Sequence, residues 1–163
     1  MNSGIGNRCP AESREYRGRF MAYAVDQLLK MSQKELDDLF RASEPGPIPD
    51  GQADGTAIIA SGTTYTAEIA TLINHFAWQG KVFDAKAGYL KNRILPFGLN
   101  AIVAKVYQAP SLLDGKDCIV LDYSETSVVA HWIRDEIRLI SPQLYLGKVY
   151  WEKAPLFDFA LKF

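Results

Sequence analysis

The sequence has little of what usually marks a function. It contains two cysteines and two histidines, and no run approaches the roughly 20 apolar residues needed to span a bilayer. Its 18 basic and 19 acidic side chains nearly balance, whereas a general nucleic-acid binder needs a basic excess to neutralise phosphates. We therefore expect neither a nucleic-acid partner nor a membrane span.

Motifs for metals, cofactors and nucleophiles are also missing. His75 and His131 are far apart, and no H-x-x-x-H, H-E-x-x-H or C-x-x-C spacing occurs, so we expect no metal and no other cofactor. G-x-S-x-G, a phosphate loop and a dinucleotide fingerprint are absent. Cys9 and Cys118 fit two free thiols, and the N-terminus lacks a signal pattern, so a cytoplasmic location is expected.

The chain is long enough for one domain with its own core. Residues 1–16 resemble a flexible tail, 17–50 hold N-terminal helices and a Pro/Gly linker, and 51–163 form the main domain. Ser32 and Glu35 make a capping box that starts the second helix. The apolar faces of the two helices are Met21, Ala24, Val25, Leu28 and Leu29, then Leu36, Leu39 and Phe40.

A period of two replaces helical spacing after Gly80 and continues to the end of the chain. Turn signals such as Asp114-Gly115 separate the segments. With a short strand at 55–62, and a helix at 64–78 that covers one mouth or packs on one face, about eight strands result. Because closure removes exposed edges, we predict an α+β, mainly β fold: N-terminal helices followed by an antiparallel β-barrel.

Several segments occur in an order similar to the bacterial GXWXG-type domain, and this resemblance covers residues 48–163. They are "GQADG", "WQGKVF", "LDYSETSVVAHWIRDEIR", "LYLGKVYWEK" and a closing aromatic strand. Ala53 stands where the family has tryptophan. The resemblance implies a lipocalin-like barrel, but no activity, because the family has no settled function. The matching positions are Gly51, Gly55, Trp78, Gly80, Lys81 and Phe83, with Asp122 and Tyr123 near its Y-D element in swapped order.

The segment "HWIRDEIRLI" (131–140) concentrates charge in an apolar setting. If it is extended, alternate side chains point to opposite faces. Arg134, Glu136 and Arg138 then share a face that we predict to be solvated. Asp135 is the only carboxylate on the other, largely aliphatic face, where it needs a partner or takes up a proton. The candidate partners are Arg93, Lys105, Tyr123, Tyr145 and His131.

Aromatic residues with a polar tip also line apolar ligand cavities, although filling the core of a small barrel is the more ordinary role of such large side chains. The leading hypothesis is a barrel that binds a small apolar or aromatic, lipid-like molecule. Two alternatives stay open. One is a cyclase or isomerase that uses Asp135 or Asp122 as general acid or base. The other is a structural domain with a filled core, whose N-terminal helices form a homodimer. The predicted ligand contacts are Trp78, Tyr123, Asp135, Tyr145 and Trp151.

Overall fold

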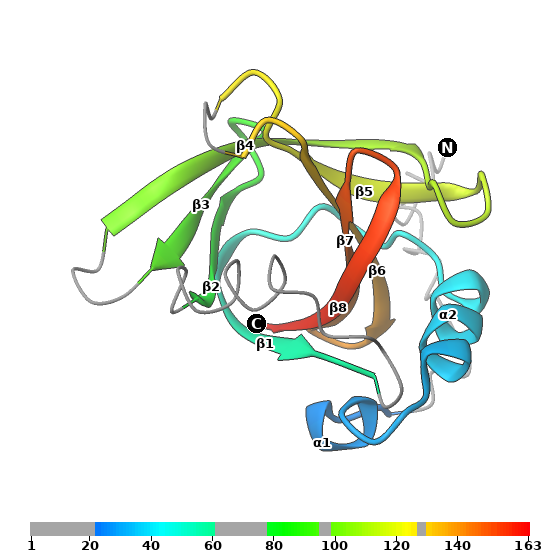
Figure 1. Cartoon of the computed structure of the whole chain (residues 1–163). Coiled ribbons are helices and arrows are strands. Elements are labelled where there is room, and N and C mark those ends of the chain that lie inside the picture. The colour runs from blue at the N-terminus through cyan, green and yellow to red at the C-terminus, as the bar shows by residue number, and fades with distance from the viewer. Residues whose placement is uncertain (1–21, 61–77, 95–98, 127–129) are drawn as a thin grey trace, which may run out of the picture.

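The described chain consists of two short helices followed by a closed antiparallel barrel, which confirms the predicted fold class (Figure 1). The structure is a computed structural model that describes residues 22–60, 78–94, 99–126 and 130–163. The helices are α1 (Val25–Leu28) and α2 (Gln33–Ala42). The strands are β1 (Gly51–Ile58), β2 (Trp78–Asp84), β3 (Tyr89–Ile94), β4 (Leu99–Pro110), β5 (Asp117–Asp122), β6 (Ile133–Ser141), β7 (Leu144–Trp151) and β8 (Ala154–Lys162).

Each strand pairs with its neighbours in the sequence, and β1 pairs with β8 to close the barrel. The closing ladder runs from Asp54↔Lys162 to Ile58↔Asp158. Every strand therefore has two partners, so no backbone edge is left open between them. Because successive side chains point to opposite faces, each strand supplies one row to the interior and one to the exterior.

The barrel interior is mainly apolar. Three of its aromatic side chains meet where β8 ends, with the rings of Phe83 and Phe163 5.6 Å apart and those of Tyr145 and Phe163 5.7 Å apart. Ile48 of the linker packs against the same cluster. β8 and the residue after it supply one row of side chains to this interior. Its members there are Phe157, Phe159, Leu161 and Phe163.

A second apolar cluster lies outside the barrel, between the helices and the outer face of the sheet. The predicted capping box is confirmed, since Ser32 N donates to Glu35 Oε2 at 2.8 Å and Glu35 N donates to Ser32 Oγ at 3.4 Å. None of the described helices is long and apolar enough to cross a membrane. The buried members of this cluster are Leu28, Leu36, Phe40, Ile58, Ala60, Cys118, Val120, Ile140, Leu144, Leu146 and Ala160.

Some predicted boundaries were wrong. The first strand begins at Gly51 rather than Gly55, because the "GQADG" segment is extended and pairs with β2. Leu29 was placed on the buried face of the first helix, yet it is 48% exposed, since α1 lasts for only four residues. Most of the helix predicted at 64–78, like the tail with Cys9, lies outside the described residues.

The predicted solvated face of the charged segment is also wrong. Alternate side chains of β6 do point to opposite faces, as predicted. On the outer face, however, Glu136 and Arg138 are both 0% exposed. Glu136 accepts hydrogen bonds from Ser111 Oγ at 2.5 Å, Leu112 N at 2.9 Å and Arg134 Nε at 2.9 Å. The turn between β4 and β5 therefore folds over this part of the outer face and satisfies the carboxylate.

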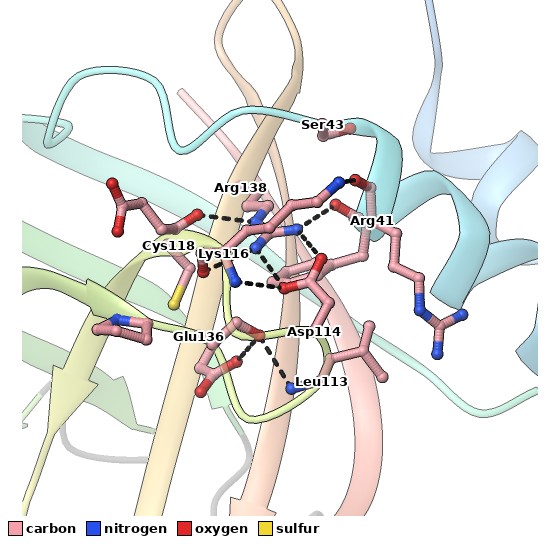
Figure 2. A network of polar contacts seen from close by, with 12 residues as sticks. Arg41, Ser43, Leu113, Asp114, Lys116, Cys118, Glu136 and Arg138 are labelled. Atoms are coloured by element: carbon pink, nitrogen blue, oxygen red, sulfur yellow. Dashed lines mark hydrogen bonds and ion pairs between the residues drawn. The ribbon is translucent and has the colours of Figure 1, made fainter.

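Arg138 joins that turn to helix α2, as Figure 2 shows. Its guanidinium makes a two-pronged ion pair with Asp114, with both nitrogen–oxygen distances at 2.8 Å. It also donates to Phe40 O at 2.8 Å, and to Lys116 O and Asp117 O at 3.0 Å each. The guanidinium carbon lies 4.6 Å from the ring centroid of Phe40. One side chain thus binds the last turn of α2 to the sheet and fixes the β4–β5 turn.

The hydroxyl of Tyr150, also on the outer face, is buried and has no hydrogen-bond partner among the described residues. A buried polar group without a partner destabilises a fold. Tyr150→Phe is therefore expected to leave the free energy of unfolding unchanged or to raise it by up to about 1 kcal/mol. Urea denaturation measures this. A loss above that size would show that the hydroxyl has a stabilising contact.

Candidate functional site

Four polar side chains meet inside the otherwise apolar barrel, and we call them the interior cluster: Lys81, Asn92, Tyr123 and Asp135. The Lys81 ammonium donates to Tyr123 OH at 2.7 Å, Asn92 Oδ1 at 2.8 Å and Asp135 Oδ2 at 2.9 Å. Tyr123 OH donates to Asp135 Oδ2 at 3.0 Å and accepts from Asn92 Nδ2 at 3.2 Å. All four residues are at most 5% exposed.

The strand pairing explains why these residues meet. Lys81 on β2 lies opposite Asn92 on β3, and Leu121 on β5 lies opposite Asp135 on β6. Tyr123 follows two residues after Leu121 and so points to the same face. The cluster therefore joins two pairs of strands across the barrel, near the end where β5 stops and β6 starts.

Gly80 sets the direction of Lys81. The pairing of β2 with β3 shifts register between Trp78 and Gly80, and such a bulge re-aims the side chains that follow it. Gly80 has φ +138°, and a Cβ atom there would lie 2.0 Å from Ala53 O. Only glycine fits this close approach.

Burial dominates the electrostatics of the interior cluster. It lowers the pKa of Lys81, although the nearby charge and hydrogen bond of Asp135 act in the opposite direction. Burial raises the pKa of Tyr123 well above its ordinary value, and the charge of Asp135 adds to this shift. Tyr123 therefore keeps its proton at neutral pH, while burial disfavours the charged form of Lys81.

The predicted site residues divide into two groups. Tyr123 and Asp135 are brought together, as just described. Tyr145 lies at the opposite end of the interior, where its hydroxyl donates to Pro47 O at 2.8 Å and burial raises its pKa to about 12. Trp151 is the last residue of β7 and is 40% exposed. The backbone of Trp78 starts β2, but its side chain lies outside the described residues.

The other predicted acid lies elsewhere. Asp122 has the outward parity of β5, and it accepts hydrogen bonds from Tyr107 OH and Ser124 N, both at 2.9 Å. Burial opposes its ionisation, but these hydrogen bonds outweigh that effect and hold its pKa below the usual value. Asp122 therefore does not belong to the interior cluster.

Sequence reasoning identified Tyr123 as a partner of Asp135 and missed the closest charge, Lys81. Of the other candidates, Arg93 pairs with Asp54 at 3.3 Å and Lys105 with Glu125. Because lysine is rarely buried, its residue type gave no signal of an interior position. The available signal was the position of Lys81 in an alternating strand. Lys81 shares a face with Phe83, which is deeply buried in the interior.

An exposed aromatic pair lies at the same end of the barrel as the interior cluster. Trp132 and Trp151 are 44% and 40% exposed, and their rings stack at 5.4 Å between centroids with an angle of 21°. His131 packs against Trp132, with 3.5 Å between ring centroids.

In the described ranges, no group of three or more His, Cys, Asp or Glu side chains is placed to hold a metal ion.

Comparisons with known proteins add a fold and no function. No family model matches the chain, and no curated protein matches it either. A solved structure described as "Crystal structure of protein from Thermomonospora curvata" is similar, with a TM-score of 0.57 and 14% sequence identity. The match covers 82% of this chain and 88% of that chain. At this identity the likeness concerns the barrel fold alone.

Proposed function

We propose that the protein binds a small, largely apolar or aromatic molecule in the interior of its barrel, with the interior cluster as the polar anchor. The observation that carries this proposal is the buried ion pair between Lys81 and Asp135 at 2.9 Å, with both side chains at most 5% exposed. An ion pair inside an apolar core generally adds little stability compared with apolar side chains of the same size. A recognition role gives a reason for its presence.

The cluster also indicates which polar group the ligand carries. The charges of the Lys81 ammonium and the Asp135 carboxylate cancel, so the interior cluster does not need a charged ligand to balance it. A neutral oxygen, as in a hydroxyl or carbonyl, therefore suits the cluster without adding net charge to the interior. The surrounding interior is lined by aliphatic and aromatic side chains, which suit an apolar body. Barrels of this strand number hold one small ligand at most.

Two further proposals accompany this one. The barrel agrees with the architecture that the GXWXG-type resemblance implies, and we propose kinship with that domain. The tryptophan of the family motif would stand at Ala53, which is fully buried among the interior residues.

We also propose a cytoplasmic location, which fits the free, buried thiol of Cys118. Burial raises the pKa of this thiol to about 12.

Native mass spectrometry of the protein purified from its host provides the first test, and a co-purifying apolar compound is the expected result. Nile red, an apolar dye with a hydrogen-bond-accepting oxygen, provides a titratable probe. Tyr123→Phe removes one hydroxyl from the anchor and is expected to weaken dye binding about threefold to tenfold. Tyr107→Phe is the matched control, because that hydroxyl donates to Asp122 on the outer surface.

An apo mass together with no binding of Nile red to the wild-type barrel would overturn the proposal. Equal weakening in both tyrosine variants would overturn the anchor role, because one of them does not reach the interior. Fluorescence intensity and emission wavelength together report whether the dye has entered an apolar environment.

An acid–base enzyme is the second candidate, and one contact favours it. Tyr123 OH donates to Asp135 Oδ2 at 3.0 Å, which places a carboxylate and a phenol where they can exchange a proton beside a bound ligand. Loss of deuterium from carbon next to a ligand carbonyl, followed by NMR, distinguishes turnover from simple binding. The dimer alternative has less support, because Leu36 and Phe40 of α2 are already buried against the chain's own barrel.

A further inference from the structure

We infer that Lys81 is an amine that condenses reversibly with aldehyde or ketone ligands, so that the interior cluster is a Schiff-base site. This inference rests on the proposed function and names the class of ligand. It also assigns separate tasks to the members of the cluster: Lys81 forms the covalent bond, while Tyr123 and Asp135 position it and move protons.

The contacts around Lys81 Nζ supply the first argument. Asp135 Oδ2 at 2.9 Å is close enough to take a proton from the ammonium, which frees an electron pair on nitrogen. Tyr123 OH accepts from the ammonium at 2.7 Å and donates to Asp135 at 3.0 Å. Once Asp135 has taken up a proton, the Tyr123 hydroxyl can instead donate to an oxygen bound next to the nitrogen. Both groups are therefore within one hydrogen bond of the atom that would react.

The apolar surroundings of Lys81 supply the second argument. Its Nζ lies 5.4 Å from the ring centroid of Tyr123 and 5.5 Å from that of Phe159. Gly147 admits the Phe159 ring, because a Cβ atom there would lie 2.2 Å from Phe159 Cζ. Desolvation of this kind lowers the pKa of Lys81 and so favours the neutral amine that attacks carbonyl groups.

The reaction balances without any other reagent. The ammonium passes one proton to Asp135, and the neutral nitrogen attacks the carbonyl carbon. One of its two remaining protons moves to the carbonyl oxygen to give a carbinolamine. The last one follows as the carbon–oxygen bond breaks, so the oxygen leaves as water. Amine and carbonyl compound become imine and water, and the reverse reaction releases the ligand unchanged.

Two compounds with the same apolar body, trans-cinnamaldehyde and cinnamyl alcohol, offer a direct test. The protein is incubated at neutral pH with trans-cinnamaldehyde and sodium cyanoborohydride, which reduces an imine to a stable secondary amine. Peptide mapping by mass spectrometry then locates the added cinnamyl group. Labelling of Lys81 is expected to exceed the mean of the other lysines by about tenfold, because the bound aldehyde is held beside the amine.

The variants isolate the role of the amine. Lys81→Arg keeps the positive charge but cannot form an imine, so the site-specific label is expected to disappear. Lys105→Arg is the matched control, since Lys105 forms its ion pair with Glu125 away from the interior, and labelling of Lys81 should persist. Mapping of the wild-type protein gives an answer even if the Lys81 variant folds poorly.

Cinnamyl alcohol separates this inference from the proposed function, because it has the same body and no carbonyl. If the alcohol displaces Nile red while Lys81 is labelled no more than the other lysines, the Schiff-base inference is overturned and the proposed function stands. If neither Nile red nor the alcohol binds, the proposed function fails and the inference fails with it. Selective labelling that excess alcohol suppresses supports both.

Discussion

Replacing Arg138 with methionine is expected to lower the free energy of unfolding by about 3–5 kcal/mol, as for removal of one partner of a buried ion pair. Methionine fills much of the same volume but donates no hydrogen bonds. Asp114 would lose its two contacts at 2.8 Å, and Phe40 O at the end of α2 would lose its donor (Figure 2). Urea denaturation followed by circular dichroism gives the measurement.

The matched control is Arg41→Met. Arg41 lies in the last turn of the same helix, but its side chain is 43% exposed and its ion pair with Asp38 is long, at 3.4 Å. Exposed pairs of this type contribute little, so a small change is expected. Similar losses in both variants would show that the Arg138 network adds nothing beyond a surface ion pair.

Asp135→Asn should have an effect of comparable size, with a loss of about 3–5 kcal/mol at neutral pH. The change keeps the shape of the side chain but leaves the Lys81 ammonium buried without its counter-charge. Asp38→Asn removes the carboxylate of an exposed pair with Lys34 and is expected to cause no measurable loss. Denaturation midpoints of the two variants at one pH make the comparison.

The pH dependence identifies the cause of that loss. The pKa of Lys81 is already lowered by burial, and removing Asp135 removes a contribution that raises it. In the variant, between the folded-state pKa of Lys81 and the ordinary value of 10.5, the unfolded chain binds more protons than the folded one. Stability of Asp135→Asn therefore rises with pH in that window. A loss that is the same at every pH would mean that the buried charge is not its source.

Alternation was enough to predict most of the barrel, because a half-buried strand records its two faces in every second residue. Every second residue from Phe157 to Phe163 shows this, since these apolar side chains do point inward. Alternation says which face a residue occupies but not what covers that face. Glu136 was therefore placed in solvent, although the β4–β5 turn covers it.

The interior cluster was half predictable for a related reason. Asp135 was conspicuous as a carboxylate in an aliphatic row, and Tyr123 was among its candidate partners. Lys81 was missed because it lies 54 residues away along the chain, and only barrel closure and the bulge at Gly80 bring the two together. Asp122, the other candidate acid, lies on the opposite face of the sheet from the cluster, because one step along β5 changes the face.

The bond from Arg138 to Phe40 also has a consequence during synthesis. The two residues are 98 positions apart, and translation adds about 5–20 residues per second. Phe40 is thus synthesised roughly 5 to 20 s before its guanidinium donor exists. Nascent chains stalled ahead of residue 138 should show this helix as protease-sensitive, and chains released beyond it should not.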